Sequence, residues 1–498
     1  MTEERDFDRL ARAWLELGPD QAPDRAIAAV LQAVETTPQV RSRPWRLPPW
    51  RFRPVNRTLS VAALAAAIIV IAGAAFWLSR PNTTDVLPGP AASASPIATP
   101  AASASPIATP AASASAVIGK ATAIAAGDTH TCAITHEGAV KCWGENFYGQ
   151  LGNGSTTDSI APVTVSGLTS GVVAISAGYS HTCVVTSGGG VKCWGLNVNG
   201  QLGNGDTAGN FNTKSTNPVG VSGLASSVIA IAAGDSHTCA LTDAGSVKCW
   251  GSNVFGALGD GTTADTAVPV DVSGLTSGVT AIATALVHSC ALTSAGGAKC
   301  WGWNRDGELG NGRSSPGRGA AADPAVDSVV PVDVSGLASG VTAIAPGATH
   351  TCAVTGGGVK CWGANAVGQL GNGTRAPSST PVDVVGLASG VTAITSDVIG
   401  PLMGPDLGSN SCALTTAGTV KCWGRGVEGQ LGNGTKANST TPVDVSGLSD
   451  VTAITTRGAH TCALTSDGGV QCWGRNGHGQ LGDGTTTDSS TPVVVSVL

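Results

Sequence analysis

The feature that most constrains this chain is a pair of cysteines that recurs seven times in nearly the same surroundings. The first copy, at 130–144, reads HTCAITHEGAVKCWG. The 14 cysteines of the 498-residue chain all belong to these pairs: Cys132/Cys142, Cys183/Cys193, Cys239/Cys249, Cys290/Cys300, Cys352/Cys361, Cys412/Cys422 and Cys462/Cys472. Successive pairs are about 50–62 residues apart, a period typical of propeller blades or solenoid units.

Each pair lies across a predicted β-hairpin. Opposed residues in an antiparallel hairpin are symmetric about the turn, so Cys132 and Cys142 centre a three-residue loop on 136–138. Such loops usually end in the left-handed region, which glycine adopts without strain, and Gly138 is at that position. Five other repeats share this spacing, whereas Cys352 and Cys361 are one residue closer and centre a two-residue Gly-Gly turn. Opposed positions are close enough for a disulfide, so we predict seven cross-strand disulfides.

A metal site is the alternative use of these residues, because in six repeats a histidine comes two residues before the first cysteine. These residues are His130, His181, His237, His288, His350 and His460. Zinc sites usually need four ligands, commonly with C-x-x-C pairs, and no repeat supplies such a set. We therefore expect no metal and no cofactor, and half-buried histidines that bond to the backbone.

The fold expected is all-β. The first repeat contains four strand patterns, at 121–126, 130–135, 139–143 and 162–166, and every repeat has a proline where the last pattern begins. Seven such units predict a seven-bladed β-propeller of four-stranded blades over 117–498, because a closed ring leaves only short strand edges. An open solenoid is the alternative, but it would need atypical units at its ends.

The N-terminal part has a different character. Residues 59–79 carry no charge and as a helix would span roughly 30 Å, so they predict one transmembrane helix. Arginines cluster in the basic juxtamembrane segment 41–58, so the positive-inside rule predicts a single-pass cell-membrane protein with a cytoplasmic N-terminus and an extracytoplasmic propeller. That location is oxidising and agrees with disulfides. A buried core helix and a cleaved signal peptide are the alternatives.

Two further segments flank the predicted membrane helix. Residues 1–40 carry two amphipathic patterns and predict a cytoplasmic helical segment. Residues 80–116 contain AASASPIATP twice, and such a Pro/Ala/Ser-rich tract predicts a disordered stalk because it cannot bury a core.

The repeats also share the run W-G-x-N-x-x-G-Q-L-G-N-G, which reads WGENFYGQLGNG at 143–154. With HTCAIT and PVTVSGL around it, this run resembles the repeat of the regulator of chromosome condensation family, a seven-bladed propeller, over about residues 117–498. The departures are Ala257, Glu308, Gly426 and Asn410. The paired cysteines are foreign to the nuclear founding member and fit an exported, bacterial-type variant. The resemblance implies protein binding, or guanine nucleotide exchange on the small GTPase Ran.

A binding surface is expected where the repeats differ. The repeated tryptophans are expected to pack between blades, whereas the two residues before the invariant loop glycine vary. In a closed ring these loops share one face, which we interpret as a partner-binding surface, with drift at unconstrained positions as the alternative. The candidate residues are Phe147, Tyr148, Asn199, Phe255, Arg305, Asp306, Glu428 and His478.

The leading functional hypothesis is a membrane-anchored extracytoplasmic module that binds an unknown protein or cell-surface polymer. No catalytic motif is present, so we expect no enzyme, and the net charge of −6 gives no sign of nucleic-acid binding. The alternatives are a guanine nucleotide exchange factor-like regulator, which needs a cytosolic partner, and a transmembrane sensor that relays external binding to residues 1–40.

Overall fold

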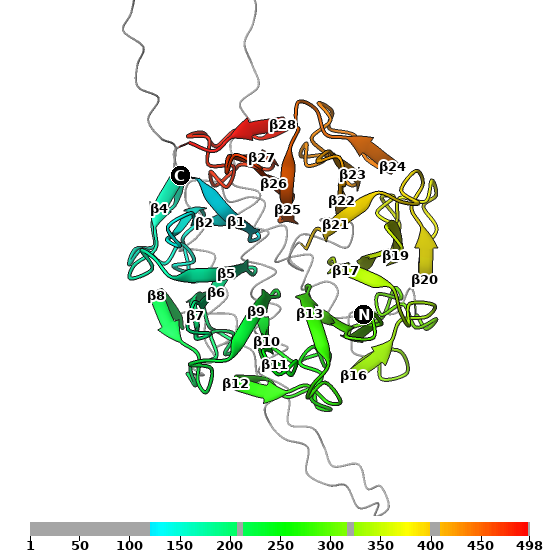
Figure 1. Ribbon diagram of the computed structural model, residues 1–498, viewed down its shortest axis with the longest axis horizontal. Coiled ribbons are helices and arrows are strands. Elements are labelled where there is room, and N and C mark those ends of the chain that lie inside the picture. The colour runs from blue at the N-terminus through cyan, green and yellow to red at the C-terminus, as the bar shows by residue number, and fades with distance from the viewer. Residues whose placement is uncertain (1–119, 207–212, 316–322, 399–408, 497–498) are drawn as a thin grey trace, which may run out of the picture. The chain divides into compact units, whose positions relative to one another are not determined.

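The computed structural model describes residues 120–206, 213–315, 323–398 and 409–496. These residues form seven four-stranded antiparallel sheets arranged as the blades of a ring (Figure 1), which confirms the all-β seven-bladed propeller. The predicted helical segment, transmembrane helix and stalk lie outside the described residues. Within the described ranges, no helix is long and apolar enough to cross a membrane.

Each blade takes its four strands from consecutive sequence, running from the centre of the ring to its rim. Blades 1 and 2 contain β1 (Ala121–Ala126), β2 (His130–Thr135), β3 (Val140–Gly144), β4 (Ser159–Thr164), β5 (Val172–Ala177), β6 (His181–Thr186), β7 (Val191–Leu196) and β8 (Lys214–Gly220). Blades 3 and 4 contain β9 (Val228–Ala233), β10 (His237–Thr242), β11 (Val247–Gly251), β12 (Thr266–Asp271), β13 (Val279–Thr284), β14 (His288–Thr293), β15 (Ala298–Gly302) and β16 (Ser328–Asp333). Blades 5 to 7 contain β17 (Val341–Pro346), β18 (His350–Thr355), β19 (Gly358–Gly363), β20 (Ser378–Asp383), β21 (Val391–Ser396), β22 (Asn410–Thr415), β23 (Val420–Gly424), β24 (Ser439–Asp444), β25 (Val451–Arg457), β26 (His460–Thr465), β27 (Val470–Gly474) and β28 (Ser489–Val494).

The outermost strand begins earlier than the sequence pattern predicts. In blade 1 it starts at Ser159, which pairs with Gly144, and Pro162 lies inside it, near an irregularity in the register. Proline has no N–H to donate, and an edge strand tolerates it because one side of the strand needs no partner. The proline therefore marks the middle of this strand, and the predicted start at 162 was wrong.

All seven predicted disulfides are present: Cys132–Cys142, Cys183–Cys193, Cys239–Cys249, Cys290–Cys300, Cys352–Cys361, Cys412–Cys422 and Cys462–Cys472. In blade 1 the two cysteines are direct partners in the β2–β3 register, and Gly138 closes the hairpin with φ of 76°. In blade 5, Gly356 and Gly357 both have positive φ, 59° and 79°, as a type I′ turn requires. The cysteines are buried, so the disulfides belong to the core.

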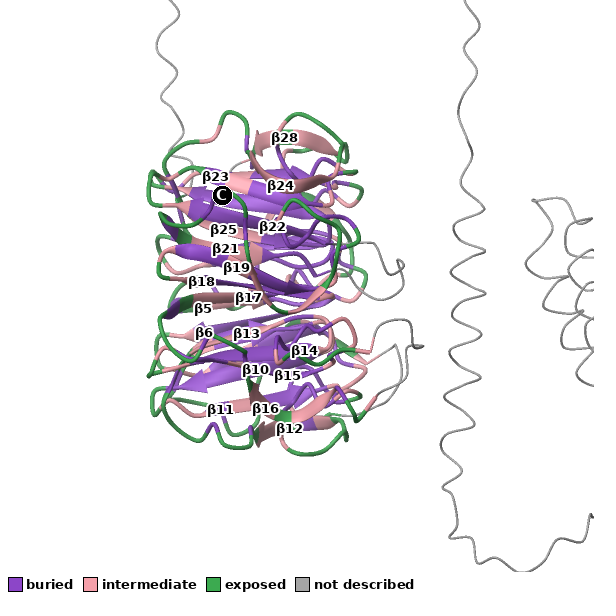
Figure 2. Cartoon of the chain, turned by 90° about the vertical axis from the view of Figure 1, so that its right-hand side faces the viewer, coloured by how far each residue is buried: buried purple, intermediate pink, exposed green. Residues whose placement is uncertain are grey.

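The core consists of one cluster at each boundary between blades. Figure 2 shows the inner strands coloured as buried along much of their length. Each cluster combines both cysteines of one blade with the tryptophan of the next; Cys132 and Cys142, for example, share a cluster with Trp194. The same arrangement joins the two ends of the described chain, where Cys462 and Cys472 pack with Trp143. The ring is thus closed by side chains across the seam, and the tryptophans have the packing role expected of them.

A bifurcated hydrogen bond accompanies this packing. The Trp194 indole N–H donates to the Gln150 carbonyl at 2.8 Å, and the Thr182 hydroxyl donates to the same oxygen at 3.1 Å. At the seam, Trp143 and Thr131 both donate to the Gln480 carbonyl at 2.9 Å. The motif glycine two residues after the glutamine lies against this indole, because a Cβ on Gly152 would be 2.6 Å from the Trp194 Nε1.

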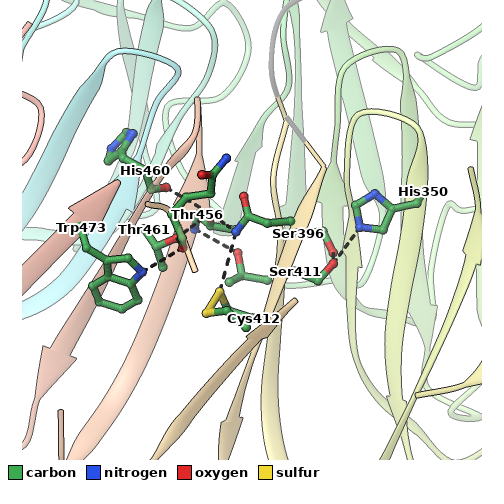
Figure 3. The surroundings of a disulfide bond; sticks show 12 residues. His350, Ser396, Ser411, Cys412, Thr456, His460, Thr461 and Trp473 are labelled. Atoms are coloured by element: carbon green, nitrogen blue, oxygen red, sulfur yellow. Dashed lines mark hydrogen bonds between the residues drawn. A yellow bond between two sulfur atoms is a disulfide. The ribbon is translucent and has the colours of Figure 1, made fainter. Parts of the chain in front are cut away.

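The histidines correct one expectation. They are buried, not half-buried, and they bond to hydroxyl groups of the next blade instead of to the backbone. His130 Nε2 is 2.9 Å from Thr182 Oγ1, and His460 Nε2 is 2.9 Å from Thr131 Oγ1 across the seam. His181, His237, His288 and His350 make the same contact with Thr238, Ser289, Thr351 and Ser411. Figure 3 shows His350 directed at Ser411.

This contact assigns the proton on the imidazole. The Thr182 hydroxyl donates its hydrogen to the Gln150 carbonyl, so its oxygen accepts from His130 Nε2, which therefore carries the proton. The opposite nitrogen, Nδ1, is buried without a partner. Burial lowers the pKa of each of the six histidines to about 3, so they are neutral at physiological pH.

We predict that each buried histidine makes the fold less stable in acid. The unfolded chain binds a proton at His181 near pH 6.5, whereas the folded protein does so only near pH 3, so acidification between these values favours unfolding. His181→Asn copies the residue that blade 6 carries as Asn410. Denaturant unfolding measured between pH 6 and 4 should show the wild type losing about 1.4 kcal/mol more per pH unit than the variant. Parallel pH profiles would show that His181 is protonated in the folded protein.

Candidate binding face

The strands alternate in direction, so the connections fall on two faces of the ring. We call the face with the first-to-second and third-to-fourth strand connections the loop face. We call the face with the second-to-third strand hairpins and the links between blades the hairpin face. Figure 2 shows the ring edge-on, with buried strands inside and exposed connections at its margins.

The two faces differ in how much the repeats vary. On the hairpin face, the links between blades read VSGLTSG at 165–171 and 272–278 and VSGLASG at 334–340, and the others differ little. The three connections longer than their equivalents, between β7 and β8, β15 and β16, and β21 and β22, all belong to the loop face. Variation in length is therefore concentrated on the loop face.

Two motif side chains, an asparagine and a glutamine, fix the backbone of the β3–β4 connection in blade 1. Asn146 Oδ1 accepts the Leu151 N–H at 3.0 Å, and its Nδ2 donates to the Ser155 and Thr157 carbonyls, both at 3.1 Å. Gln150 Oε1 accepts the Tyr148 N–H at 2.9 Å. With the loop held in this way, the two variable residues before the invariant glycine project from a defined backbone.

Among the described residues of the loop face, Phe147 is the most exposed aromatic residue, with 61% of its surface accessible. Its ring meets that of Tyr148 edge-on, with centroids 4.9 Å apart. Lys214 from blade 2 places its Nζ 5.2 Å from the Phe147 ring centroid and donates to the Phe147 carbonyl at 3.0 Å. Blades 1 and 2 thus share an aromatic and cationic patch.

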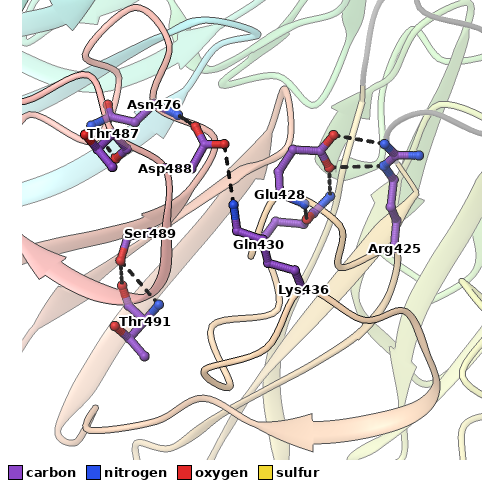
Figure 4. Close-up of polar contacts among 9 residues, drawn as sticks. All are labelled: Arg425, Glu428, Gln430, Lys436, Asn476, Thr487, Asp488, Ser489 and Thr491. Atoms are coloured by element: carbon purple, nitrogen blue, oxygen red, sulfur yellow. Dashed lines mark hydrogen bonds and ion pairs between the residues drawn. The ribbon is translucent and has the colours of Figure 1, made fainter. Parts of the chain in front are cut away.

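The other predicted residues are half-buried, and several contact protein groups. Asn199 donates to Asp265 Oδ2 of blade 3 at 3.2 Å, and His478 Nδ1 is 3.2 Å from Asp158 Oδ2 of blade 1. Glu428 pairs with Arg425 at 2.9 Å (Figure 4). Asn199 and His478 thus join loops of adjacent blades, whereas Glu428 pairs within its own loop.

Arg305 and Asp306 lie on the long β15–β16 connection of blade 4. Glu308, which replaces the motif glutamine there, accepts the Asp306 N–H through Oε2 at 2.9 Å. Burial raises the pKa of Asp306, and that of Glu308 well above its ordinary value. The predicted residues therefore share one face but do not converge on one site.

Sequence reasoning missed a buried charged group at the centre of the loop face. Arg457, at the end of β25, reaches across the ring and donates from Nη1 to the Ala233 carbonyl of β9 at 3.2 Å. Burial raises the pKa of Asp128 and of Asp397 to about 7 and that of Asp235 to about 6, and the positive charge of Arg457 opposes each shift. These three carboxyl groups outnumber the single guanidinium. A cavity of about 280 Å³ lies along the inner strands, lined by Ile124, Ile175, Ile231, Ile282, Ile344 and Ile394 among others.

A second hollow, of about 120 Å³, lies between blades 3 and 4. It is lined by Asp235, Ser236, His237, Ser252, Val254, Phe255, Ala257, Leu286 and Val287. Phe255 is the one residue of the predicted set that lines it, and its ring meets that of Trp303 edge-on at 4.4 Å. The sequence signal was the alanine at position 257, where five other blades carry glutamine.

The loop face shows no arrangement of metal ligands among its described residues. Over the described ranges, no group of three or more histidine, cysteine, aspartate or glutamate residues is placed to hold a metal ion. The chemistry that the face offers is therefore that of aromatic, hydroxyl, carboxyl and guanidinium groups.

Comparison with known proteins places this geometry in a family. A model of the RCC1-like domain matches residues 168–498, and models of the regulator of chromosome condensation repeat match 137–185 and 121–150. The ultraviolet-B receptor UVR8 of Arabidopsis thaliana is 31% identical over 333 residues, which cover 66% of this chain and 70% of that protein. The human E3 ubiquitin-protein ligase HERC2 is 35% identical over 261 residues, 51% of this chain but only 5% of that protein.

Solved structures agree on the fold. Human WBSCR16 superposes with a TM-score of 0.61 at 24% identity, covering 72% of this chain and 94% of that one. Yeast RCC1 (Prp20), in its complex with Kap60, gives 0.59 at 20% identity, covering 72% and 83%. With its repeats, its seven four-stranded blades and these matches, the chain belongs to the regulator of chromosome condensation family, as a member with an RCC1-like domain.

Proposed function

We propose that this protein is a non-enzymatic binding module that engages another protein through its loop face. The observation that carries the proposal is that all three lengthened connections lie on that face, while the links between blades on the opposite face stay nearly uniform. Selection for a partner acts on exposed loops held by a rigid scaffold, and the motif Asn146 and Gln150 bonds supply that rigidity.

The relatives support this reading. They include a receptor, a ubiquitin-protein ligase and a GTPase regulator homologue, and one solved relative is bound to Kap60. A propeller that contributes a recognition surface to different systems fits all of these. Because a fold does not carry a function by itself, the main support for protein binding is the loop face and not the ring.

The proposal also places the propeller outside the cytoplasm, anchored through residues 59–79. Its support is the set of seven disulfides, since such bonds persist in oxidising compartments and are rare in the cytosol. A guanine nucleotide exchange factor would meet its GTPase in the reducing cytosol, so the disulfides disfavour that alternative. A sensor role depends on residues 1–40, which lie outside the described residues.

The compartment is tested by the thiol state in cells. Cells quenched in acid, then denatured and treated with a maleimide polymer, should yield a protein with no modified cysteine. After reduction, all 14 cysteines should react. The reason is that every cysteine is in a buried disulfide and none is free in the described ranges. Extensive modification before reduction would place the propeller in a reducing compartment and contradict the proposed location.

The face is tested by site-specific photocrosslinking of the full chain in its native cells. A photoreactive phenylalanine analogue at Phe147, exposed on the loop face, should form a protein adduct. The matched control is the same analogue at Thr169, exposed on the hairpin face. Adducts confined to Phe147 are the expected result, and an unlabelled excess of the protein should compete them away. Equal adducts from Thr169, or adducts from Thr169 alone, would contradict binding through the loop face.

A further inference from the structure

Blades 3 and 4 depart from the other repeats at two places that face each other. In blade 3, Ala257 stands where Gln150, Gln201, Gln369, Gln430 and Gln480 occupy the equivalent position and Glu308 the sixth. In blade 4, the turn between β13 and β14 is Ala285-Leu286-Val287, whereas the other short turns begin with glycine. The small side chain and the apolar turn together border the 120 Å³ hollow, which we call the blade 3–4 pocket.

The walls of the blade 3–4 pocket are apolar, but one of its groups is an acid. Val254, Phe255, Leu286 and Val287 supply hydrocarbon, and Val254 is 55% exposed at the surface of the loop. Asp235 lines the same space; its Oδ2 accepts the Ser236 hydroxyl at 3.1 Å, and its Oδ1 is buried without a hydrogen-bond partner. An apolar space beside an incompletely bonded carboxylate is suited to a side chain with an aliphatic stem and a cationic end.

The loss of the glutamine also frees a backbone donor. In blade 1 the glutamine oxygen accepts the Tyr148 N–H at 2.9 Å, and the same bond is made at Asn199 and His478. Ala257 has no side chain that could accept the equivalent Phe255 N–H. The Phe255 N–H therefore lacks the side-chain acceptor that the other blades supply, and the polar residues that line the pocket include Asp235, Ser236 and Ser252.

The surrounding charge favours a cation. Asp235 belongs to the central group in which three carboxyl groups accompany Arg457, and no ion pair between Arg457 and Asp235 closes that carboxylate. The other ionisable group of the pocket, His237, is neutral and is engaged through Nε2 with Ser289 at 2.9 Å. Asp235, with a pKa of about 6, is mostly ionised at neutral pH, and this negative charge favours a positively charged occupant.

The size of the pocket also fits such a side chain. On this measure a single water needs about 10–15 Å³, so a space of about 120 Å³ is well above that of one water and leaves room for a side chain such as that of arginine. The Phe255 ring, held edge-on against Trp303, gives a planar guanidinium an aromatic surface to stack on. These features favour arginine over lysine.

We propose that the blade 3–4 pocket receives an arginine side chain of the partner protein, with the aliphatic stem between Phe255 and Leu286 and the guanidinium on the Asp235 carboxylate. This inference rests on the proposed function, because it names the chemistry by which the loop face holds its partner. The pocket would act as the anchor of that interface, as a buried arginine often does.

Ligand-observed NMR titration of the full chain tests the pocket with small probes. N-acetyl-argininamide should bind, and its neutral isostere N-acetyl-citrullinamide should bind at least tenfold more weakly, because it has the same shape without the charge. N-acetyl-lysinamide should lie between them. Equal binding of the arginine and citrulline probes, or no binding of the arginine probe, would overturn the proposal.

Two variants and a matched control sharpen the test. Ala257→Gln fills the pocket with the residue that five blades already carry, so it should fold normally and abolish binding of the arginine probe. Asp235→Asn should weaken that binding at least tenfold. Asp243→Asn removes the same charge from the same blade on the hairpin face, where Asp243 is exposed, and should change nothing. Unchanged binding by Ala257→Gln would show that the probe binds elsewhere.

The Ala257→Gln variant also distinguishes a failure of the arginine-anchor proposal from a failure of the protein-binding proposal. If adducts at Phe147 form equally in the wild type and in Ala257→Gln, the protein-binding proposal stands and the anchor proposal is wrong. If the arginine probe binds as expected but Phe147 gives no adduct, the pocket binds arginine, but the proposed protein contact at Phe147 is wrong. Loss of both signals in Ala257→Gln supports both proposals.

Discussion

The structure depends on one carbonyl oxygen in each blade, that of the residue at the motif glutamine position. Into the Gln150 carbonyl, the next blade donates the Trp194 indole N–H and the Thr182 hydroxyl, and that hydroxyl in turn accepts from His130. Each unit is therefore completed by its neighbour, and the disulfides lie in the clusters that the tryptophans seal. Because the two ends of the described chain meet through the same contacts at Gln480, every blade has a neighbour on both sides.

These contacts between blades explain which positions of the repeat motif recur. The tryptophan, glutamine and asparagine positions are needed to join and shape the blades, so they recur. The residues between them carry no such duty and are free to diverge. Where a joining residue does change, chemistry follows: Ala257 leaves a pocket, and Glu308 places a carboxyl group with a strongly raised pKa inside the loop. Asn410 stands where the other blades have a histidine. Its Nδ2 donates to the hydroxyl of Thr456 on β25 of blade 7, at 3.4 Å, and not to that of Thr461 on β26, which is equivalent to the hydroxyls that the histidines contact.

Local geometry was predictable from the sequence, and contacts between blades were not. The symmetry of each hairpin about its glycine was enough to pair all the cysteines, and a tally of strand patterns gave the blades. The histidines were misread because their partner hydroxyls lie 52 or more residues away, in another repeat. The Arg457 contact with Ala233 spans 224 residues and has no counterpart in other blades, so no repeat pattern could indicate it. The departure at Ala257 was visible, but its meaning needed the turn that faces it.

The most direct test of the account compares the seam with an interior boundary. Trp143→Phe removes the indole that joins blade 1 to blade 7, and Trp194→Phe removes its equivalent between blades 1 and 2. Each change deletes a buried donor and leaves a cavity, so we expect each to lower the free energy of unfolding in guanidinium by about 2–4 kcal/mol. A closed ring predicts that the two losses agree within about 0.5 kcal/mol. A much smaller loss at Trp143 would mean that the ends are not joined and would contradict the account.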